Sequence, residues 1–342
     1  MKNKYIKQGF VCMLSAFSLI ALLGVVNIKS NYRVNADETT AYNNGKDKIK
    51  IDGSLKNKKL ILTRKHKEVK CGKQKVFRVN LNGAKWKVSD KKIAKIKKID
   101  DRRIVLTGKR YGKVTLTVRV KGKKISTKVK IMPKAIVGID AGHQKNANYE
   151  LEPIGPGSSQ KKIKVAGGTR GISTGKSEGT LNLEIALKLK EKLIDKGYKV
   201  VMVREKAEVN ISNSERAKKL NKKCDISIRI HADGSDNSTI NGVSLLYPPA
   251  SNPYIGNLSG KSYKLASCIL EKYCEKTGIK NNGLKGRNDL TGFNFSTIPV
   301  ALIEMGYMTN YSEDEFMSSS SGKKKMVDGI ALGVEKYYGY EK

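Results

Sequence analysis

The 342-residue sequence predicts an α/β domain with a mostly parallel sheet covered by helices on both faces, preceded by a small all-β sandwich. Two observations lead to this prediction. Short β-rich runs separated by glycines fill residues 53–132, whereas strand-like and helix-like patterns alternate over residues 134–342. Strands interleaved with helices are typical of a parallel sheet with both faces covered. A segment of about two hundred residues is also long enough to form one domain with an ample core.

The start of the chain has the pattern of an export signal. Met1 to Lys7 contains three lysines, and Gly9 to Ile28 is almost entirely apolar. Val34-Asn35-Ala36 offers a small-residue cleavage site, so we expect a signal peptide over residues 1–36; a stretch of about twenty apolar residues could also remain as a membrane anchor. Residues 37–52 are polar and are predicted to be a linker. In either case the rest of the chain is expected outside the cytoplasm, secreted or at the cell wall.

Residues 53–132 are predicted to fold as an antiparallel β-sandwich. The β-rich runs are Leu60 to Thr63, Val76 to Val79, Ala84 to Val88, Ile104 to Leu106, Val114 to Val118 and Ile125 to Ile131. The pattern Trp86-Lys-Val-Ser-Asp90, Ile93-Ala94, Gly108 and Gly112-Lys-Val-Thr-Leu-Thr-Val118 resembles bacterial immunoglobulin-like domains of the second type. This resemblance implies an immunoglobulin-like sandwich.

The positive charge of the chain is concentrated in the predicted sandwich. Lys50 to Met132 contains 29 Lys and Arg against 5 Asp and Glu, a net charge of +24 out of +37 for the whole chain. Such a surface attracts polyanions. Nucleic acid is the usual polyanion, but the export signal removes the chain from it, so anionic wall polymers or the outer face of the membrane are the expected partners. The alternative is that the lysines only keep the surface soluble.

Four cysteines remain after the predicted cleavage: Cys71, Cys224, Cys268 and Cys274. Exported proteins can form disulfides, but none of these spacings resembles a disulfide framework. The four also lack a Cys-x-x-Cys zinc pattern. We therefore expect free thiols.

The predicted α/β domain begins with an apolar run, Ile136 to His143, that ends in a glycine-flanked loop and is expected to form a buried strand. The elements expected after it are a helix over Gly179 to Lys196, a strand over Lys199 to Val203, a helix over Asn213 to Asn221, a strand ending at His231, a strand over Gly242 to Tyr247, a helix over Ser259 to Thr277, a strand ending at Glu304 and a helix over Lys323 to Tyr338. The first helix carries Leu181, Ile185, Leu189 and Leu193 at intervals of four, as on one helix face.

Three of these apolar runs end in a polar residue that can do chemistry. They are Ile136 to His143, Ile226 to His231 and Pro299 to Glu304, and Glu178 opens the first helix. Ligands bind outside the carboxyl ends of strands in open α/β sheets, so these ends indicate one shared site. The alternatives are that each histidine is structural and that Glu178 only complements the helix dipole. Two histidines with one or two carboxylates suit Zn²⁺ with an open position for water.

The ordered motifs resemble the zinc-dependent N-acetylmuramoyl-L-alanine amidases of the amidase-3 type. The motifs are Ile139-Asp-Ala-Gly-His143, Ser177-Glu178, Asn182-Leu183, Arg204, Asn213-x-x-Arg216-Ala217, Ser227-Ile-Arg-Ile-His231-Ala-Asp233 and Pro299-Val-Ala-Leu-Ile-Glu304-Met-Gly-Tyr-Met-Thr-Asn310. The resemblance implies that His143, Glu178 and His231 bind zinc and that Glu304 is the catalytic carboxylate. It also implies peptidoglycan as substrate, cut between N-acetylmuramic acid and L-alanine.

Three further residues are candidates for substrate contact: Asn182, Arg204 and Arg216. Ion pairing is the alternative role for the two arginines, and Asn182 would share a helix face with Glu178. The chain departs from the family pattern between Gln144 and Lys176, which we expect to be a longer loop. Two other functions stay open at this point. One is a zinc-dependent peptidase or deacetylase with another exported substrate, and the other is a non-catalytic protein that binds the cell wall.

Overall fold

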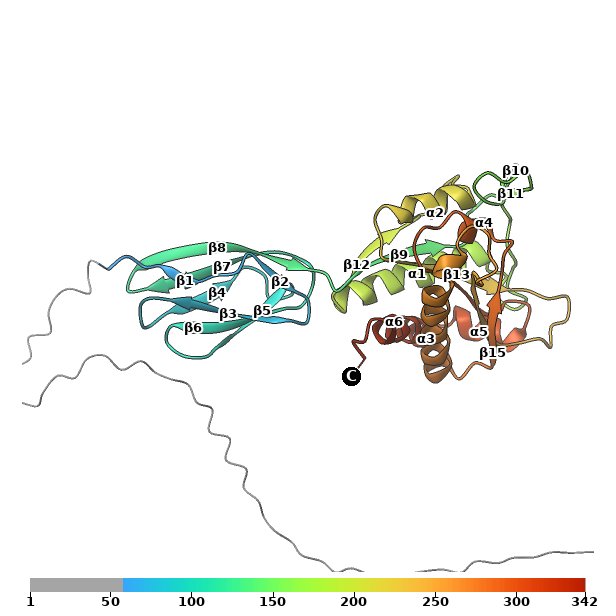
Figure 1. The fold of residues 1–342 in the computed structure, drawn as a ribbon. Helices are drawn as coiled ribbons and strands as arrows, with labels where there is room; N and C mark the ends of the chain where they lie inside the picture. Colours follow the sequence, from blue (N-terminus) through green and yellow to red (C-terminus); the bar gives the residue numbers. More distant parts are fainter. Residues whose placement is uncertain (1–57, 342) are drawn as a thin grey trace, which may run out of the picture. The chain divides into compact units, whose positions relative to one another are not determined.

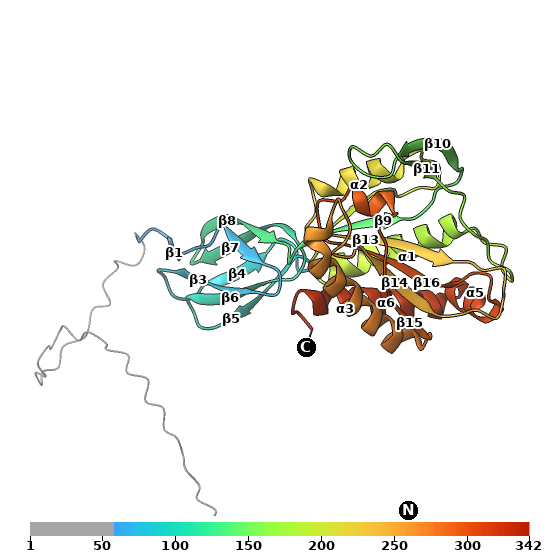
Figure 2. The ribbon, with the colours of Figure 1, turned by 45° about the vertical axis from the view of Figure 1, so that its right-hand side comes forward.

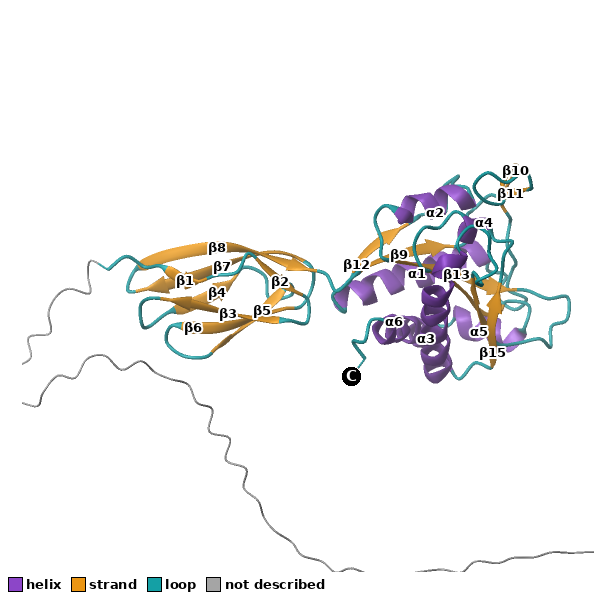
Figure 3. Cartoon of the chain, in the orientation of Figure 1, coloured by secondary structure: helices purple, strands orange, loops and turns teal. Residues whose placement is uncertain are grey.

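The computed structural model describes residues 58–341, and the predicted signal peptide and linker over residues 1–52 lie outside this range. Within residues 58–341, no helix is both long and apolar enough to span a membrane. The described elements fall into two groups along the chain: strands alone up to Met132, and then strands mixed with helices (Figures 1 and 3). Each group is described by itself below.

The first group is a β-sandwich of two four-stranded sheets. The strands are β1 (Leu62–Arg64), β2 (Glu68–Lys70), β3 (Gln74–Val79), β4 (Lys85–Val88), β5 (Ala94–Lys98), β6 (Arg103–Gly108), β7 (Gly112–Val120) and β8 (Lys123–Met132). One sheet has the order β1-β3-β6-β5 and the other β2-β8-β7-β4. The predicted all-β sandwich is therefore confirmed, with β2 and β5 as additional short strands. The expectation that all strands run antiparallel is wrong for β2, which pairs with β8 in parallel.

The sandwich forms because its strands alternate apolar and polar side chains. In β7 the buried residues are Val114, Leu116, Val118 and Val120, and the residues between them face outward. The buried side chains of both sheets meet in a core that includes Phe77 and Leu106. The β7–β8 hairpin turns through Lys121 and Gly122, whose φ angles are 45° and 81°. Two positive φ angles are what a two-residue turn of this kind requires, which is why glycine stands there.

The second group is built on a six-stranded sheet with the order β12-β9-β13-β16-β14-β15. The strands are β9 (Ile136–Ala141), β12 (Lys199–Met202), β13 (Ile226–Asp233), β14 (Val243–Tyr247), β15 (Asn281–Gly286) and β16 (Val300–Tyr307). All neighbours are parallel except β14, which runs antiparallel to β16. The predicted mostly parallel sheet is confirmed.

Helices cover both faces of this sheet, as predicted. The helices are α1 (Glu178–Asp195), α2 (Asn213–Asn221), α3 (Ser259–Thr277), α4 (Thr291–Asn294), α5 (Tyr311–Ser318) and α6 (Ser320–Tyr337), with the short 3₁₀ helix η2 (Gly256–Leu258) before α3. Residues of α1, α3 and α6 pack in one large core with one set of strand side chains, such as Ile303. The opposite face, which includes Leu302, packs on Phe293 of α4, and Leu220 of α2 covers Val203.

The long helices α3 and α6 lie against each other in both views (Figures 1 and 2). Two glycines of α6 allow this contact. A Cβ added at Gly329 would come within 2.7 Å of the Tyr273 Cα, and one at Gly333 within 2.5 Å of the Ile269 Cα. Any larger residue would push the helices apart, so these glycines determine how closely α3 and α6 approach each other.

The segment from Gln144 to Lys176 contains secondary structure that the sequence did not predict. Strands β10 (Asn148–Pro153) and β11 (Lys161–Val165) form an antiparallel hairpin. Its outward side carries Tyr149, which is 72% exposed, and Leu151, which is 59% exposed. The expected long loop is thus partly a hairpin. The short elements β15, α4 and α5 were also not predicted.

Candidate active site

The predicted site residues lie at the carboxyl edge of the parallel strands. His143 follows β9, His231 lies near the end of β13, and Glu304 is the register partner of His231 on β16. Parallel strands present their carboxyl ends at one edge, so residues far apart in the sequence meet there. Glu178 reaches the same place as the first residue of α1. His143 has a φ of 57°, a conformation uncommon for a residue other than glycine, and it turns the chain at the end of β9.

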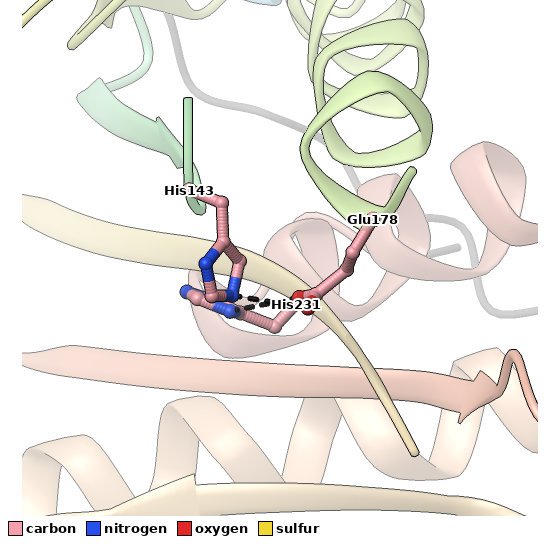
Figure 4. A group of neighbouring side chains, drawn as sticks. All are labelled: His143, Glu178 and His231. Atoms are coloured by element: carbon pink, nitrogen blue, oxygen red, sulfur yellow. Dashed lines mark hydrogen bonds and ion pairs between the residues drawn. The ribbon is translucent and has the colours of Figure 1, made fainter. Parts of the chain in front are cut away.

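The side chains of His143, Glu178 and His231 converge (Figure 4). Nε2 of His143 lies 3.0 Å from Oε2 of Glu178, and Nδ1 of His231 lies 3.1 Å from Oε1 of Glu178. The two imidazole rings meet edge to face, with centroids 4.9 Å apart. One potential ligand atom from each residue lies within 4.8 Å of the other two, which is close enough for a single metal ion to contact all three.

Backbone groups and Asn182 fix the carboxylate of Glu178. Its Oε2 accepts a hydrogen bond of 3.1 Å from the Thr169 amide, and its Oε1 accepts one of 3.2 Å from the Ala232 amide. Asn182 Nδ2 donates to Oε1 of Glu178 at 3.1 Å and to the Gly142 carbonyl at 3.4 Å. Asn182 is fully buried and therefore acts on Glu178 and the loop of His143 in this structure, not at the surface.

Local contacts also orient the two histidines. Nδ1 of His143 lies 2.8 Å from the Ala166 carbonyl and donates to it, so Nε2, which points towards Glu178, is the nitrogen that a metal would bind. The ring of His231 packs against Gly142, where an added Cβ would stand 2.2 Å from Nε2. Only Nδ1 of His231 is therefore turned towards Glu178. A residue larger than glycine at position 142 would displace this ring.

The electrostatics of Glu178 and His231 suit a metal. Burial raises the pKa of Glu178, but hydrogen bonds and charge interactions with the two histidines outweigh burial and hold the pKa below its ordinary value. Burial lowers the pKa of His231 below its ordinary value. Burial also lowers the pKa of His143, but the hydrogen bond and charge of Glu178 raise it overall. Near neutral pH, Glu178 is a carboxylate and His231 a neutral imidazole, the states that metal coordination requires.

Glu304 lies in the same pocket, which has a volume of about 630 Å³. Its Oε2 is buried and has no hydrogen-bond partner among the residues that the structure describes. Burial raises the pKa of Glu304 well above its ordinary value, and the charges of Glu178 and Asp233 add to this. A carboxyl group with a raised pKa in a pocket can accept and release a proton near neutral pH. Asp233, Ser235, Asp236 and Thr309 also line the pocket. Two of them, Asp233 and Thr309, lie in the motifs quoted above, but none of the four was predicted as a site residue.

Arg204 and Arg216 do not line the pocket and instead hold the loop that carries His143. Arg204 donates from Nε to the Ala141 carbonyl at 2.9 Å, and from Nη2 to the Gly142 carbonyl at 2.9 Å and the Gly179 carbonyl at 2.7 Å. Arg216 donates from Nη2 to the His143 carbonyl at 2.9 Å. Direct contact of these arginines with substrate stays a prediction.

A buried charge network lies behind the site and was not predicted from the sequence. Asp140 lies 2.9 Å from Nη1 of Arg216 and 3.0 Å from Nε of Arg229, and all three side chains are at most 6% exposed. Asp140 and Arg229 are register partners on β9 and β13. Asp140 and Arg229 both lie in the sequence motifs that contain the two histidines, but their pairing depends on strand register. The network fixes the carboxyl ends of the strands that carry His143 and His231.

Protein-family models match both groups of elements. A family model described as N-acetylmuramoyl-L-alanine amidase matches residues 137–336, more than half of the chain. A second model, described as the N-terminal region of a pilus formation protein, matches residues 64–132. This second region is a domain of immunoglobulin-like type, and the predicted resemblance is confirmed at that level.

Individual relatives agree. The chain is 27% identical over 217 residues to the N-acetylmuramoyl-L-alanine amidase Rv3717 of Mycobacterium tuberculosis, covering 58% of this chain and 84% of that protein. It is 27% identical over 168 residues to the amidase LytC of Bacillus subtilis, covering 49% of this chain but only 32% of the longer relative.

Solved structures give the same result. The crystal structure of the N-acetylmuramyl-L-alanine amidase Ami1 from Mycobacterium smegmatis aligns with a TM-score of 0.54 and 28% identity, covering 60% of this chain and 97% of that one. Ami1 from Mycobacterium abscessus aligns with a TM-score of 0.53 and 26% identity, covering 59% of this chain and 97% of that one. The chain therefore belongs to the N-acetylmuramoyl-L-alanine amidase family, hydrolases that cleave the amide bond between N-acetylmuramic acid and L-alanine in peptidoglycan.

Proposed function

We propose that this amidase works with Zn²⁺ held by His143, Glu178 and His231, and that Glu304 is its catalytic carboxylate. The observation that carries the proposal is the convergence of the three potential ligands within 4.8 Å of one another. Two imidazole nitrogens and one carboxylate oxygen form a donor set typical of catalytic zinc sites, which keep a further position open. Two of the three proposed ligands also have a fixed hydrogen-bond partner: the Ala166 carbonyl for His143 and the Asn182 amide for Glu178.

A zinc ion bound here would act as a Lewis acid that lowers the pKa of water towards about 7. Glu304 would then accept and donate the proton that moves during the reaction. Its buried Oε2, free of hydrogen bonds from described residues, is available to take the proton of the attacking water. The raised pKa lets Glu304 hold this proton and pass it to the amine of L-alanine as the amide bond breaks. Register pairing with His231 keeps Glu304 beside the proposed ligands during both transfers.

The basic sandwich is proposed to hold the enzyme on anionic wall polymers. Support comes from the net charge of +24 over Lys50 to Met132, a segment in which no residue was identified as catalytic. An enzyme that cuts peptidoglycan works outside the cytoplasmic membrane, which agrees with export by a signal peptide over residues 1–36, or with retention of that segment as a membrane anchor. Nucleic acid is not an expected partner in that compartment.

Two measurements on the purified protein test the zinc proposal together. Metal analysis should find close to one zinc per chain, and digestion of purified wall should release free muramoyl groups and new L-alanine amino termini. Exchanging His143, Glu178 or His231 singly for Ala should lower both zinc content and release. Full zinc occupancy in all three variants would overturn the ligand assignment. Products with other new termini, or released acetate, would instead indicate a peptidase or a deacetylase.

A further inference from the structure

Three arginines form a row across the outer face of the sheet β1-β3-β6-β5. Arg64 on β1 is the register partner of Arg78 on β3, and Arg78 is the register partner of Arg103 on β6. Residues that are directly opposite on neighbouring strands point to the same face, with strands about 4.8 Å apart. All three side chains are exposed, and Arg102 next to the row is exposed as well. Four guanidinium groups are thus gathered on one small surface.

This arrangement is unfavourable for the sandwich alone. Like charges that are directly opposite on neighbouring strands destabilise a sheet. Asp100 offsets only part of the charge: its Oδ2 accepts a hydrogen bond of 2.6 Å from Nε of Arg103. Among the described residues, no carboxylate forms an ion pair with Arg64, Arg78 or Arg102. The guanidinium groups of these three are therefore available to an anion from outside.

The row lines a groove rather than a flat surface. The groove has a volume of about 640 Å³ and is bounded by the four arginines together with Thr63, Val76, Asn80 and Ile99. Val76 and Ile99 give it an apolar part against which the carbon backbone of a polyol can rest. Thr63 and Asn80 add polar groups at its side. A chain that carries phosphates between short polyol units fits this combination of cationic and apolar walls.

We propose that this groove, which we call the arginine groove, binds the phosphodiester groups of an anionic polyol-phosphate polymer of the cell wall. The inference rests on the proposed wall binding and deepens it by naming the site and the chemical class of ligand. The planar guanidinium group can donate two parallel hydrogen bonds to one phosphate, whereas a lysine ammonium acts as a point charge. Specific binding should therefore come from these arginines and not from the more numerous lysines.

The other sheet of the sandwich supplies a matched control. Lys113, Lys124 and Lys128 are exposed residues of β7 and β8, and none of them has an ion pair with a described carboxylate. Changing all three to Gln removes the same charge as changing Arg64, Arg78 and Arg102 to Gln. A third variant, Arg64→Lys, Arg78→Lys and Arg102→Lys, keeps the charge but removes the paired donors.

The experiment measures binding of the full-length chain and its three variants to purified wall, with its phosphodiester polymers present or extracted, and to soluble poly(glycerol phosphate). We expect the Arg→Gln variant to bind the polymer at least about tenfold more weakly than the Lys→Gln variant, and the Arg→Lys variant to bind more weakly than the wild type. Thermal unfolding checks folding, since removing repulsion should leave the melting temperature of the Arg→Gln variant unchanged or higher.

The outcomes separate this inference from the proposal on which it rests. If the wild type binds extracted and unextracted wall equally, wall-polymer binding itself fails. If it needs the polymer but the Arg→Gln and Lys→Gln variants lose equal affinity, only the arginine groove fails, because the charge then acts as a diffuse field. Tighter binding to DNA with the same number of phosphates than to poly(glycerol phosphate) would overturn the assignment of a wall polymer as the ligand.

Discussion

The two parts of the chain use arginine in opposite ways. In the catalytic part Arg204, Arg216 and Arg229 are buried and bonded to backbone carbonyls or to Asp140. In the sandwich Arg64 and Arg78 lie opposite each other on the neighbouring strands β1 and β3. Both are exposed, and neither has a described carboxylate partner. A buried guanidinium held by protein groups is a fixed structural part, whereas an exposed row of them is a surface that an anion from outside can stabilise. Substitutions in the catalytic part should therefore lower turnover, stability or metal binding, whereas substitutions in the sandwich should lower binding to the wall.

The largest effect should follow from Glu304→Gln. The amide keeps the shape of the side chain but cannot accept the proton, so turnover of soluble muropeptides should fall by about 10² to 10⁴. Zinc content should stay at the wild-type level because Glu304 is not a proposed ligand. The checks are single-turnover kinetics and metal analysis on the same sample. Hydrolysis close to the wild-type rate would remove Glu304 from the mechanism.

Asp140→Asn should mainly affect stability. It leaves two buried guanidinium groups without their anion, which typically costs about 3 to 5 kcal/mol. Burial raises the pKa of Asp140, but the charges of Arg216 and Arg229 outweigh burial and bring it from 3.8 to about 2. The stabilisation is therefore complete above about pH 4 and is lost as the pH falls towards 2.

Urea unfolding at pH 7 and pH 3 measures both effects of Asp140. The variant should unfold at lower urea at pH 7, and the difference from the wild type should shrink at pH 3. An equal free energy of unfolding for the two proteins at pH 7 would show that the network does not stabilise the fold.

Arg204→Lys should weaken zinc binding without abolishing it. Arg204 joins the Gly142 carbonyl, next to His143, to the Gly179 carbonyl, next to Glu178. A lysine keeps the charge but cannot reach both carbonyls with a planar group. Groups that orient metal ligands typically contribute about 10- to 100-fold to metal affinity. Competition with a chelator measures this, and Arg119→Lys on the exposed side of β7 is the control. Equal affinity in both variants would contradict a positioning role.

Much of this fold was predictable because its signals are local. Helices α2 and α3 have the predicted bounds. The mostly polar helix α2 begins with the capping residue Ser212, whereas α3 has clear apolar periodicity. Strand β15 was missed because Asn281 to Gly286 is polar and glycine-rich. The hairpin β10–β11 was missed because two of its apolar residues, Leu151 and Ile163, pair on an exposed face and give no buried alternation.

The residues of the site also differ in whether the sequence alone predicts them. His143, His231 and Glu304 stood out because each follows an apolar run, and the shared edge of a parallel sheet brings such ends together. The Asp140 network depends on strand register, and the arginine groove depends on which residues of β1, β3 and β6 are opposite one another. These strand pairs (β9–β13, β1–β3 and β3–β6) are not consecutive in the chain, so no hairpin turn fixes their register, and the sequence does not show which residues become opposite one another.

The smallest expected effect is that of salt on turnover, and it is compared with the effect of salt on wall binding by the same protein. Raising the ionic strength from 0.1 to 1 M shortens the Debye length from about 10 to about 3 Å. Retention of the full-length chain on intact wall should fall steeply, because the sandwich charges are exposed and act through solvent. Hydrolysis of small soluble muropeptides should change little, because the contacts that fix Glu178 and His143 are hydrogen bonds of about 3 Å in a partly enclosed pocket.

Co-sedimentation with wall and a soluble turnover assay, run over one salt series, give the two curves. The Lys113→Gln, Lys124→Gln and Lys128→Gln variant should shift the retention curve to lower salt and leave the turnover curve in place. If retention and turnover fell together, salt would be acting on the catalytic part. If retention did not depend on salt at all, the +24 charge of Lys50 to Met132 would only keep the surface soluble, and the sandwich would then be a spacer before the catalytic part.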